Sequence, residues 1–441
     1  MSYKISTRLF NRLYLPITLV IGYLCATVLL FEFGPIDYYT PRKSIFYSYI
    51  FYYMISLSLG YLVAMDFVRI RKENRTGKII DFKVLVLFAL VGSLIENMNV
   101  ARTGSLIPTN IIDFFGSGLD FRAAGERYYT NKASSENYST SRVLNIAAIL
   151  IAWSRLFLVV YIGYNIHKLS RNRLLIGAVV CAIYPLGAIS IGLNKPVMET
   201  AFLFLISVII AIALNRAEMS TKVIKKLRFW GWIGLIFILL AIAAFVNAME
   251  SRGVTILFLE FSSPVGYITV NCSFCTEEQT GILTGLIWFI NYIVQGYHGF
   301  SLALEEQFES TFGFGNSSFL IRQFEVFFGI DLSPRTFQIK TDYLWGAESR
   351  WHSIYTHFAN DVGFVGVGFV LFMLGWLFGF TWKVATYQKN VYAILLLPIY
   401  SFMFLFFPAN NQVLSFVASL SAFIFAHFMM FRTYQNGRNR S

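Results

Sequence analysis

Long apolar runs, separated by polar segments, dominate the chain. A run of about twenty apolar residues spans the hydrocarbon core of a bilayer as one helix. The pattern therefore predicts an all-α polytopic membrane protein, built as a single membrane domain over residues 1–441. We expect ten membrane-spanning helices, at residues 13–33, 44–65, 80–99, 143–164, 172–192, 196–215, 229–249, 357–382, 390–408 and 411–431.

Two of the polar segments, at residues 100–142 and 250–356, are much longer than the others. The second contains an apolar and aromatic stretch at 281–300 that is interrupted by Gly296 and Gly299. If this stretch crossed the bilayer once, it would reverse the orientation of every later span. We therefore predict a helix that lies on the membrane surface or enters the membrane without crossing it.

The charge distribution sets the orientation. Only 14% of the residues are charged, whereas soluble proteins have about 25%. The net charge of +12 is concentrated in short loops: 22 Lys and Arg residues lie in one set of segments, and 13 lie in the longer segments on the other side. The positive-inside rule then places both termini in the cytoplasm and the two long loops outside. Orientation in the lipid bilayer thus accounts for the excess of basic residues, which therefore does not indicate a nucleic-acid partner.

The cysteines and acidic residues do not suggest a metal or a cofactor. Cys25 and Cys181 fall in apolar spans, and Cys272 and Cys275 lie close together in the second long loop. No second pair or nearby histidine completes a zinc site, so a local disulfide and two free thiols both remain open. The chain contains no clustered carboxylates and no nucleotide-binding motif, and we expect neither metal nor cofactor.

Basic residues at the outer edges of the predicted spans are candidates for binding phosphate oxygens. Arginine binds phosphate with two parallel hydrogen bonds, and lysine acts more as a point charge. The candidates are Arg252, Arg350, Lys195, Arg142 and Arg322.

One arginine, Arg155, falls inside a predicted span, where a charge is costly and usually either functional or paired. Its position predicts a depth toward the cytoplasmic half and either an internal ion pair or a side chain that extends to the interface. Glu96 and Glu199 lie near the outer ends of their spans, where each could pair with a cation or face an outer cavity.

Two histidines, His352 and His357, lie at the outer entrance of the span at 357–382. They are five residues apart, so they would not share one face of a continuous helix, which argues against a metal pair. A histidine is suited to act as a general base near neutral pH. His298 is a third candidate, and Asp361 could orient a histidine or cap the helix entrance.

The run from His352 to Gly366 has Asp361 nine residues after the histidine and Gly363 eleven residues after it. This spacing resembles that of bacterial O-antigen polymerases and the related O-antigen ligases. The turn 192–196 also resembles these proteins, although Lys195 replaces the arginine that many of them carry. The run 295–301 and the later Gly-Phe-Gly at 313–315 are similar to the polymerase branch.

The resemblance implies a metal-independent membrane glycosyltransferase with the GT-C class B architecture in the bacterial inner membrane. The donor would be an oligosaccharide on undecaprenyl pyrophosphate, and the acceptor would be a hydroxyl of another repeat unit. At the periplasmic face, His352, or His357 in reserve, would act as base with Asp361 orienting it, and the five basic candidates would bind the pyrophosphate. A chain-length regulator protein is a further partner that the family suggests.

Two alternatives remain open. A ligase would transfer the glycan to a different acceptor, such as a lipid core. A polysaccharide flippase or other transporter would move its substrate instead, but many transporters have internal repeats and none is evident in this sequence.

Overall fold

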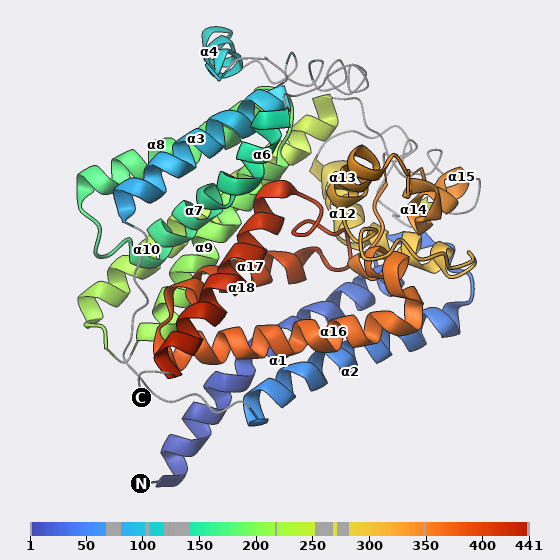
Figure 1. Ribbon diagram of the computed structural model, residues 1–441, viewed down its shortest axis with the longest axis horizontal. Helices are drawn as coiled ribbons and strands as arrows, with labels where there is room; N and C mark the ends of the chain where they lie inside the picture. Colours follow the sequence, from blue (N-terminus) through green and yellow to red (C-terminus); the bar gives the residue numbers. More distant parts are fainter. Residues whose placement is uncertain are drawn as a thin grey trace. The chain divides into compact units, whose positions relative to one another are not determined.

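The computed structural model describes residues 2–67, 81–101, 106–118, 123, 127, 142–216, 218–251, 268–270, 282–346 and 350–438. Within this part of the chain, nearly all regular structure is helical (Figure 1). Eight of the described helices are long and apolar enough to cross a membrane, and two more apolar helices, Ile149–Asn165 and Val391–Phe406, are shorter. These helices lie at the ten predicted positions, and the chain is an α-helical multi-pass membrane protein.

The chain divides into two compact units, a division that the hydropathy pattern does not reveal. The first unit comprises residues 1–75, 255–389 and 403–416, and the second comprises residues 76–254, 390–402 and 417–441. Helix α17 (Val391–Phe406) contributes residues to both units.

The first unit joins segments that are far apart in the sequence. Its two short strands form an antiparallel sheet in which Ile36 lies opposite Val270 and Tyr38 lies opposite Ile268. This pairing is the one departure from a helical fold among the described residues. The elements are α1 (Ser2–Phe33), β1 (Ile36–Tyr38), α2 (Lys43–Phe67), β2 (Ile268–Val270), α12 (Ile282–Ala303), α13 (Ser318–Phe328), the 3-10 helix η2 (Ser333–Arg335), α14 (Phe337–Lys340), α15 (Asp342–Trp345) and α16 (Ile354–Gln388).

Helices α2 and α16 of the first unit lie side by side over much of their length (Figure 1). Glycines bring their backbones together: a Cβ atom on Gly60 would lie 1.9 Å from the Phe372 carbonyl oxygen, and one on Gly375 would lie 2.1 Å from that of Leu57. Small residues allow this close approach between membrane helices, where dispersion contacts are the main source of association.

Helix α16 is interrupted at Gly363, which has a φ of 68°. Such a backbone conformation is readily available only to glycine, and it releases carbonyl groups from the helical hydrogen-bond pattern. The loop before α13 satisfies two of these carbonyls, because the Thr311 amide donates to Asn360 O at 3.0 Å and the Ser310 hydroxyl donates to Asp361 O at 3.0 Å. The start of α16 can therefore have a different direction from the rest of the span.

The second unit is a bundle of apolar helices (Figure 1). The span predicted at 143–164 consists of two helices that meet at Ala152, where the side chains of Trp153 and Ser154 donate to the carbonyls of Leu150 and Ile151. The last helix begins later than the predicted residue 411. The elements of this unit, apart from α17, are α3 (Phe82–Ala101), α4 (Thr109–Gly116), α6 (Arg142–Ile151), α7 (Trp153–Asn165), α8 (Arg171–Ile189), α9 (Lys195–Asn215), α10 (Thr221–Ser251) and α18 (Val417–Arg438).

Candidate active site

His352 lies just before α16 in the first unit, and only 1% of its surface is exposed. Its Nε2 atom is 2.8 Å from Thr341 Oγ1, and that hydroxyl is also 2.8 Å from the Phe337 carbonyl oxygen. A threonine hydroxyl has one proton, and a carbonyl can only accept, so Thr341 donates to Phe337 and His352 Nε2 donates to Thr341. The lone pair is then on Nδ1, which has no hydrogen-bond partner among the described residues.

Close to His352, aromatic and cationic side chains gather around His298 and Trp345. The His298 ring meets the Trp345 ring edge-on at a centroid distance of 4.4 Å and lies 5.4 Å from the Tyr38 ring. The Arg350 guanidinium carbon lies 4.3 Å from the centroid of the Trp345 ring, within the range of a cation–π contact. We refer to Tyr38, His298, Trp345, Arg350 and His352 as the His352 cluster.

Two glycines of α12 make room for the cluster. A Cβ atom on Gly299 would lie 2.8 Å from His352 Cδ2 and 2.9 Å from Trp345 Nε1. The Ser353 amide donates to the Gly296 carbonyl at 2.9 Å. These are the glycines that interrupt the apolar stretch at 281–300, and from residue 294 onward most of α12 is buried inside the first unit.

Burial sets the charge state of the cluster. Burial is the main cause that lowers the pKa of His352 and of His298 to about 3, and nearby charges, from His357 and Arg350 respectively, add to it. Burial also lowers the pKa of Arg350, to about 10. At neutral pH the two imidazoles are therefore neutral and the guanidinium is charged. The cluster can accept a proton on a histidine and can interact with an anion through Arg350.

Asp361 of α16 holds a loop rather than a histidine. Its Oδ1 atom accepts hydrogen bonds from Thr311 Oγ1 at 2.5 Å, from the Gly313 amide at 2.9 Å and from the Gly315 amide at 2.8 Å. Its Oδ2 atom accepts from the Asn316 amide at 3.1 Å. None of these bonds involves His352. The carboxylate thus fixes residues 311–316 against the start of α16, and it interacts electrostatically with His357.

Asn360, which sequence reasoning missed, links this loop to the cluster. Its buried side chain accepts from the Phe337 amide at 2.9 Å and donates to the carbonyl of Gly315 and to the side chain of Gln338. Helix α14 starts at Phe337 and ends next to Thr341, the partner of His352. Asn360 lies within the run 352–366, but its position in that run does not indicate a function. Its role is visible only once the structure shows the loop beside it.

His357 lies in the second turn of α16 and is half-buried. It forms a side-chain hydrogen bond with Asn410 of the same unit. It is the more accessible of the two histidines and remains the reserve candidate.

The five basic candidates occupy different places. Arg350 belongs to the His352 cluster, and Arg322 is exposed on α13. Lys195 and Arg142 are the first residues of α9 and α6 in the second unit, and Lys195 is half-buried. Arg252 lies outside the described residues, as do Cys272 and Cys275.

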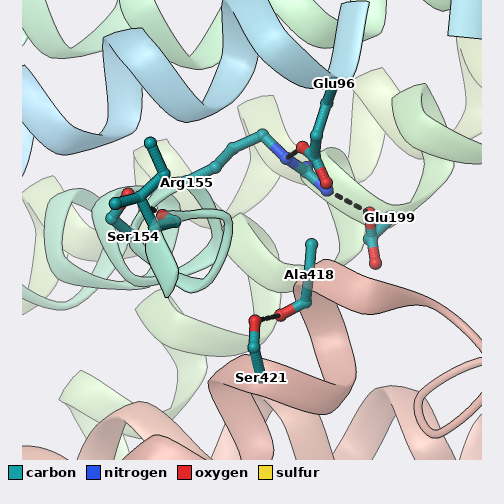
Figure 2. A network of polar contacts seen from close by, with 7 residues as sticks. Glu96, Ser154, Arg155, Glu199, Ala418 and Ser421 are labelled. Carbon is teal, nitrogen blue, oxygen red and sulfur yellow. Dashed lines mark hydrogen bonds and ion pairs between the residues drawn. The ribbon is translucent and has the colours of Figure 1, made fainter. Parts of the chain in front are cut away.

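In the second unit, Arg155 bridges two carboxylates (Figure 2). Its Nε atom is 2.6 Å from Glu96 Oε2, and its Nη2 atom is 3.2 Å from Glu199 Oε2. The guanidinium also lies over the Tyr184 ring at 4.4 Å. The predicted ion pair is confirmed. The expected cytoplasmic depth does not fit, because the guanidinium meets glutamates near the helix ends that the charge pattern places outside.

The sequence gives little sign of the residues that gather around His298 and His352. Tyr38 comes from β1, and its hydroxyl donates to Asn291 of α12 at 2.7 Å. Thr341 follows α14 and has no motif around it. These residues are ordinary in the sequence and gather only through long-range contacts.

Among the described residues, no three histidine, cysteine, aspartate or glutamate side chains are grouped so that they could hold a metal ion. Comparison with known proteins gives no assignment: neither a family model, nor a curated protein, nor a solved structure matches the chain.

Proposed function

We propose that this protein is a membrane glycosyltransferase that joins oligosaccharide repeat units carried on undecaprenyl pyrophosphate into a surface polysaccharide. It works without a metal, at the periplasmic face of the bacterial inner membrane, and has the GT-C class B architecture. The observation that carries the proposal is the His352 cluster at the entrance of a membrane span: a buried neutral histidine whose Nδ1 has no partner among the described residues, next to His298 and Trp345, with the buried Arg350 guanidinium over the Trp345 ring.

The chemistry requires one proton transfer and one leaving group. The acceptor hydroxyl attacks the anomeric carbon of the donor, a new glycosidic bond forms, and the bond from that carbon to the pyrophosphate oxygen breaks. The hydroxyl proton passes to His352 Nδ1, and the electron pair stays on undecaprenyl pyrophosphate. Arg350 stabilises the negative charge that develops there, as preorganised cations do in other enzymes.

The low pKa of His352 is consistent with a role as general base if the bound substrate places a negative charge near the imidazole. An imidazole with a pKa of about 3 is neutral at pH 7 but is a weak base. A pyrophosphate bound close to it favours the protonated form and raises that pKa toward neutrality. His352 would then become a stronger base only when the donor is bound.

A ligase would use the same chemistry with a different acceptor, and it remains a variant of this proposal. A transporter is the second candidate, and the buried Glu96–Arg155–Glu199 bridge favours it. Ionisable groups within membrane spans often mark paths for ions or substrates. The two functions differ in product, because only the enzyme lengthens the glycan.

The test is an assay of the purified protein with lipid-linked repeat units, read as a ladder of glycan lengths. We expect His352→Ala to lower polymer formation by about 10²–10⁴-fold, the usual contribution of a general base. Arg350→Gln should lower it by roughly 10²–10³-fold, as the loss of one charge-stabilising donor does. Chelation of divalent cations should leave the ladder unchanged.

The matched control is His167→Ala, at a half-buried histidine of the second unit, which should polymerise at the normal rate. A normal ladder from His352→Ala would refute the base assignment. No ladder from the native protein, together with transfer of the glycan to an added lipid core, would indicate a ligase. Movement of intact lipid-linked units across proteoliposomes, with no lengthening, would indicate a transporter.

A further inference from the structure

A second feature of the first unit has no part in the proposed chemistry. The end of α13 and the loop before it carry large apolar side chains that are exposed, and Phe327 is 78% exposed. We call this set the α13 apolar surface; its members are Phe312, Val326, Phe327, Phe328 and Ile330. A contiguous exposed apolar patch of this kind usually marks an interaction site.

The helix that carries most of these exposed side chains is capped at both ends. Ser317 caps the start of α13 by accepting from the Leu320 amide. Gly329 ends the helix with a φ of 68°, and its amide donates to the Glu325 carbonyl at 2.8 Å. On the inner side, the Phe324 ring lies 4.6 Å from both the Phe314 and the Phe328 rings.

The α13 apolar surface is tied to the beginning of a membrane span. The amide of Thr311 donates to the Asn360 carbonyl at 3.0 Å, and the Gly313 amide donates to Asp361. Both acceptors lie in the second turn of α16, which is one of the candidate spans. The loop that carries Phe312 therefore stays close to the point at which α16 begins.

The exposed side of α16 continues this surface. Val362 and Val365 are exposed on the candidate span, Val365 to 69%, and exposed apolar side chains on a span are expected to face lipid. Phe308 is also exposed, and its ring lies 3.6 Å from the position that a Cβ atom on Gly363 would take. Phe308 thus lies beside the exposed part of α16, and Phe312 follows it four residues later in the same loop.

The charges at the edge of the surface suit lipid headgroups. Arg335 lies over the Phe312 ring at 5.4 Å, and its Nη1 atom donates to the Ser310 carbonyl at 3.4 Å. Arg322 is exposed on the polar side of α13, near Ser318 and Glu325 by helical spacing. Aromatic rings next to arginines are typical of segments that lie at a membrane interface.

We infer that α13 is an interfacial helix: the α13 apolar surface inserts into the bilayer leaflet around the start of α16, with Arg322 and Arg335 at the headgroups. In the predicted topology this is the outer leaflet. A second protein copy would also cover apolar rings, but the hydrogen bonds that hold the Phe312 loop at the start of the candidate span α16 favour the bilayer. The inference does not depend on glycosyl transfer.

The test places an environment-sensitive fluorescent amino acid, genetically encoded, at position 327 of the full-length protein in nanodiscs of phosphatidylethanolamine and phosphatidylglycerol. Lipids with a nitroxide near the glycerol end of the acyl chain should quench it strongly, and aqueous iodide should quench it weakly. The matched control has the same probe at position 325, which is exposed on the polar side of α13. It should show the opposite preference.

Equal iodide quenching at both positions, with no effect of the nitroxide lipids, would overturn the inference. A second result would also overturn the inference: emission at position 327 that is not quenched by the nitroxide lipids but changes when the protein is diluted in detergent. Such emission would indicate that a second copy covers the surface. The double variant Phe327→Ser, Phe328→Ser gives an independent readout. Its thermal stability in detergent should match that of the native protein, while the stabilisation gained on transfer to nanodiscs should be smaller; an unchanged gain would contradict the inference.

Discussion

At the scale of single residues, the neutral state of His352 follows from its burial and from the absence of a charged hydrogen-bond partner among the described residues. It is buried, and among the described residues its one hydrogen bond is to the neutral hydroxyl of Thr341, with none to a carboxylate. The nearest carboxylate in the same sequence run, Asp361, is occupied by loop amides. A histidine in this setting stays neutral at pH 7 unless a negatively charged group binds next to it.

This setting predicts a pH-dependent stability. His298 and His352 have a pKa of about 3 in the folded protein, against 6.5 for an ordinary histidine. The unfolded chain therefore binds more protons, so the stability that these groups contribute is complete above pH 6.5 and is lost as the pH falls from 6.5 toward 3. Each histidine contributes a slope of up to about 1.4 kcal/mol per pH unit.

Thermal unfolding in detergent, followed between about pH 7 and pH 5, measures this slope. His352→Gln should flatten it by close to half of the part due to the two histidines. His167→Gln, at a half-buried site, should flatten it less. A slope that is the same in native protein and His352→Gln would contradict the assigned neutral state.

Asp361→Asn should loosen the loop that the carboxylate holds. An amide presents one acceptor oxygen and one donor, so several of the bonds from residues 311–316 lose their acceptor. Because Asp361 is half-buried, we expect a loss of about 1.5–3 kcal/mol in the free energy of unfolding. Amide hydrogen exchange at Gly313 and Gly315 should also become faster.

The control for this variant is Asp331→Asn. Asp331 is exposed and accepts from the Ser333 amide at 2.8 Å, and its replacement should change stability by less than about 1 kcal/mol. If Asp361→Asn leaves exchange at Gly313 and Gly315 as slow as before, the carboxylate does not organise the loop.

At the scale of elements, the sequence predicts the positions of the helices well. It predicts poorly where a helix is interrupted and which strands pair. The apolar runs locate each candidate span along the chain, because a bilayer requires an unbroken apolar length. Some ends differ by six to eight residues, as where α10 begins at Thr221 instead of 229 and α18 begins at Val417 instead of 411. The interruption of α16 at Gly363 depends on Thr311 and Ser310, which donate to the carbonyls of Asn360 and Asp361 that the break releases. The pairing of β1 with β2 depends on three-residue strands that have no detectable period. Such features arise from contacts between distant segments.

The bridge between α3, α7 and α9 gives an element-scale prediction. Arg155→Met leaves Glu96 and Glu199 facing each other without their cation, and it should lower the free energy of unfolding by about 3–5 kcal/mol. The triple variant Glu96→Gln, Arg155→Met, Glu199→Gln removes all three charges and should recover most of that loss. Thermal unfolding in detergent measures both.

The same pair of variants tests what the bridge is for. A stable triple variant that still makes polymer assigns the bridge to structure. A stable triple variant without activity assigns it to function, in accord with the transporter alternative or with a role for Lys195 close by. If Arg155→Met alone is as stable as the native protein, the bridge does not join the helices in the way described.

At the scale of the whole molecule, the charge pattern predicts which side each loop faces. Ser310→Cys should react with a membrane-impermeant maleimide in spheroplasts, and Thr221→Cys should react only after the membrane is opened. Both are made in a chain whose native cysteines are replaced. Labelling of Ser310→Cys only after opening would invert the topology and place His352 in the cytoplasm. That result would also be incompatible with a periplasmic polymerase.

The composition and hydropathy establish the class of the molecule, but not its division into two units. Each unit combines segments from different thirds of the chain. Hydropathy reports on the environment of each segment, and it contains no information on which segments touch. For the same reason the sequence could indicate His352 and Arg350, but not Tyr38, Thr341 or Asn360.

The pairing of β1 with β2 has a consequence for biogenesis. Tyr38 lies opposite Ile268, about 230 residues later in the chain. At a synthesis rate of roughly 5–20 residues per second, β1 emerges roughly 10–50 s before its partner. During that interval the helices between them enter the membrane, while the N-terminal strand waits without its neighbour. A nascent chain arrested before residue 268 would therefore leave Tyr38 without its strand partner, where a chaperone or a protease can reach it.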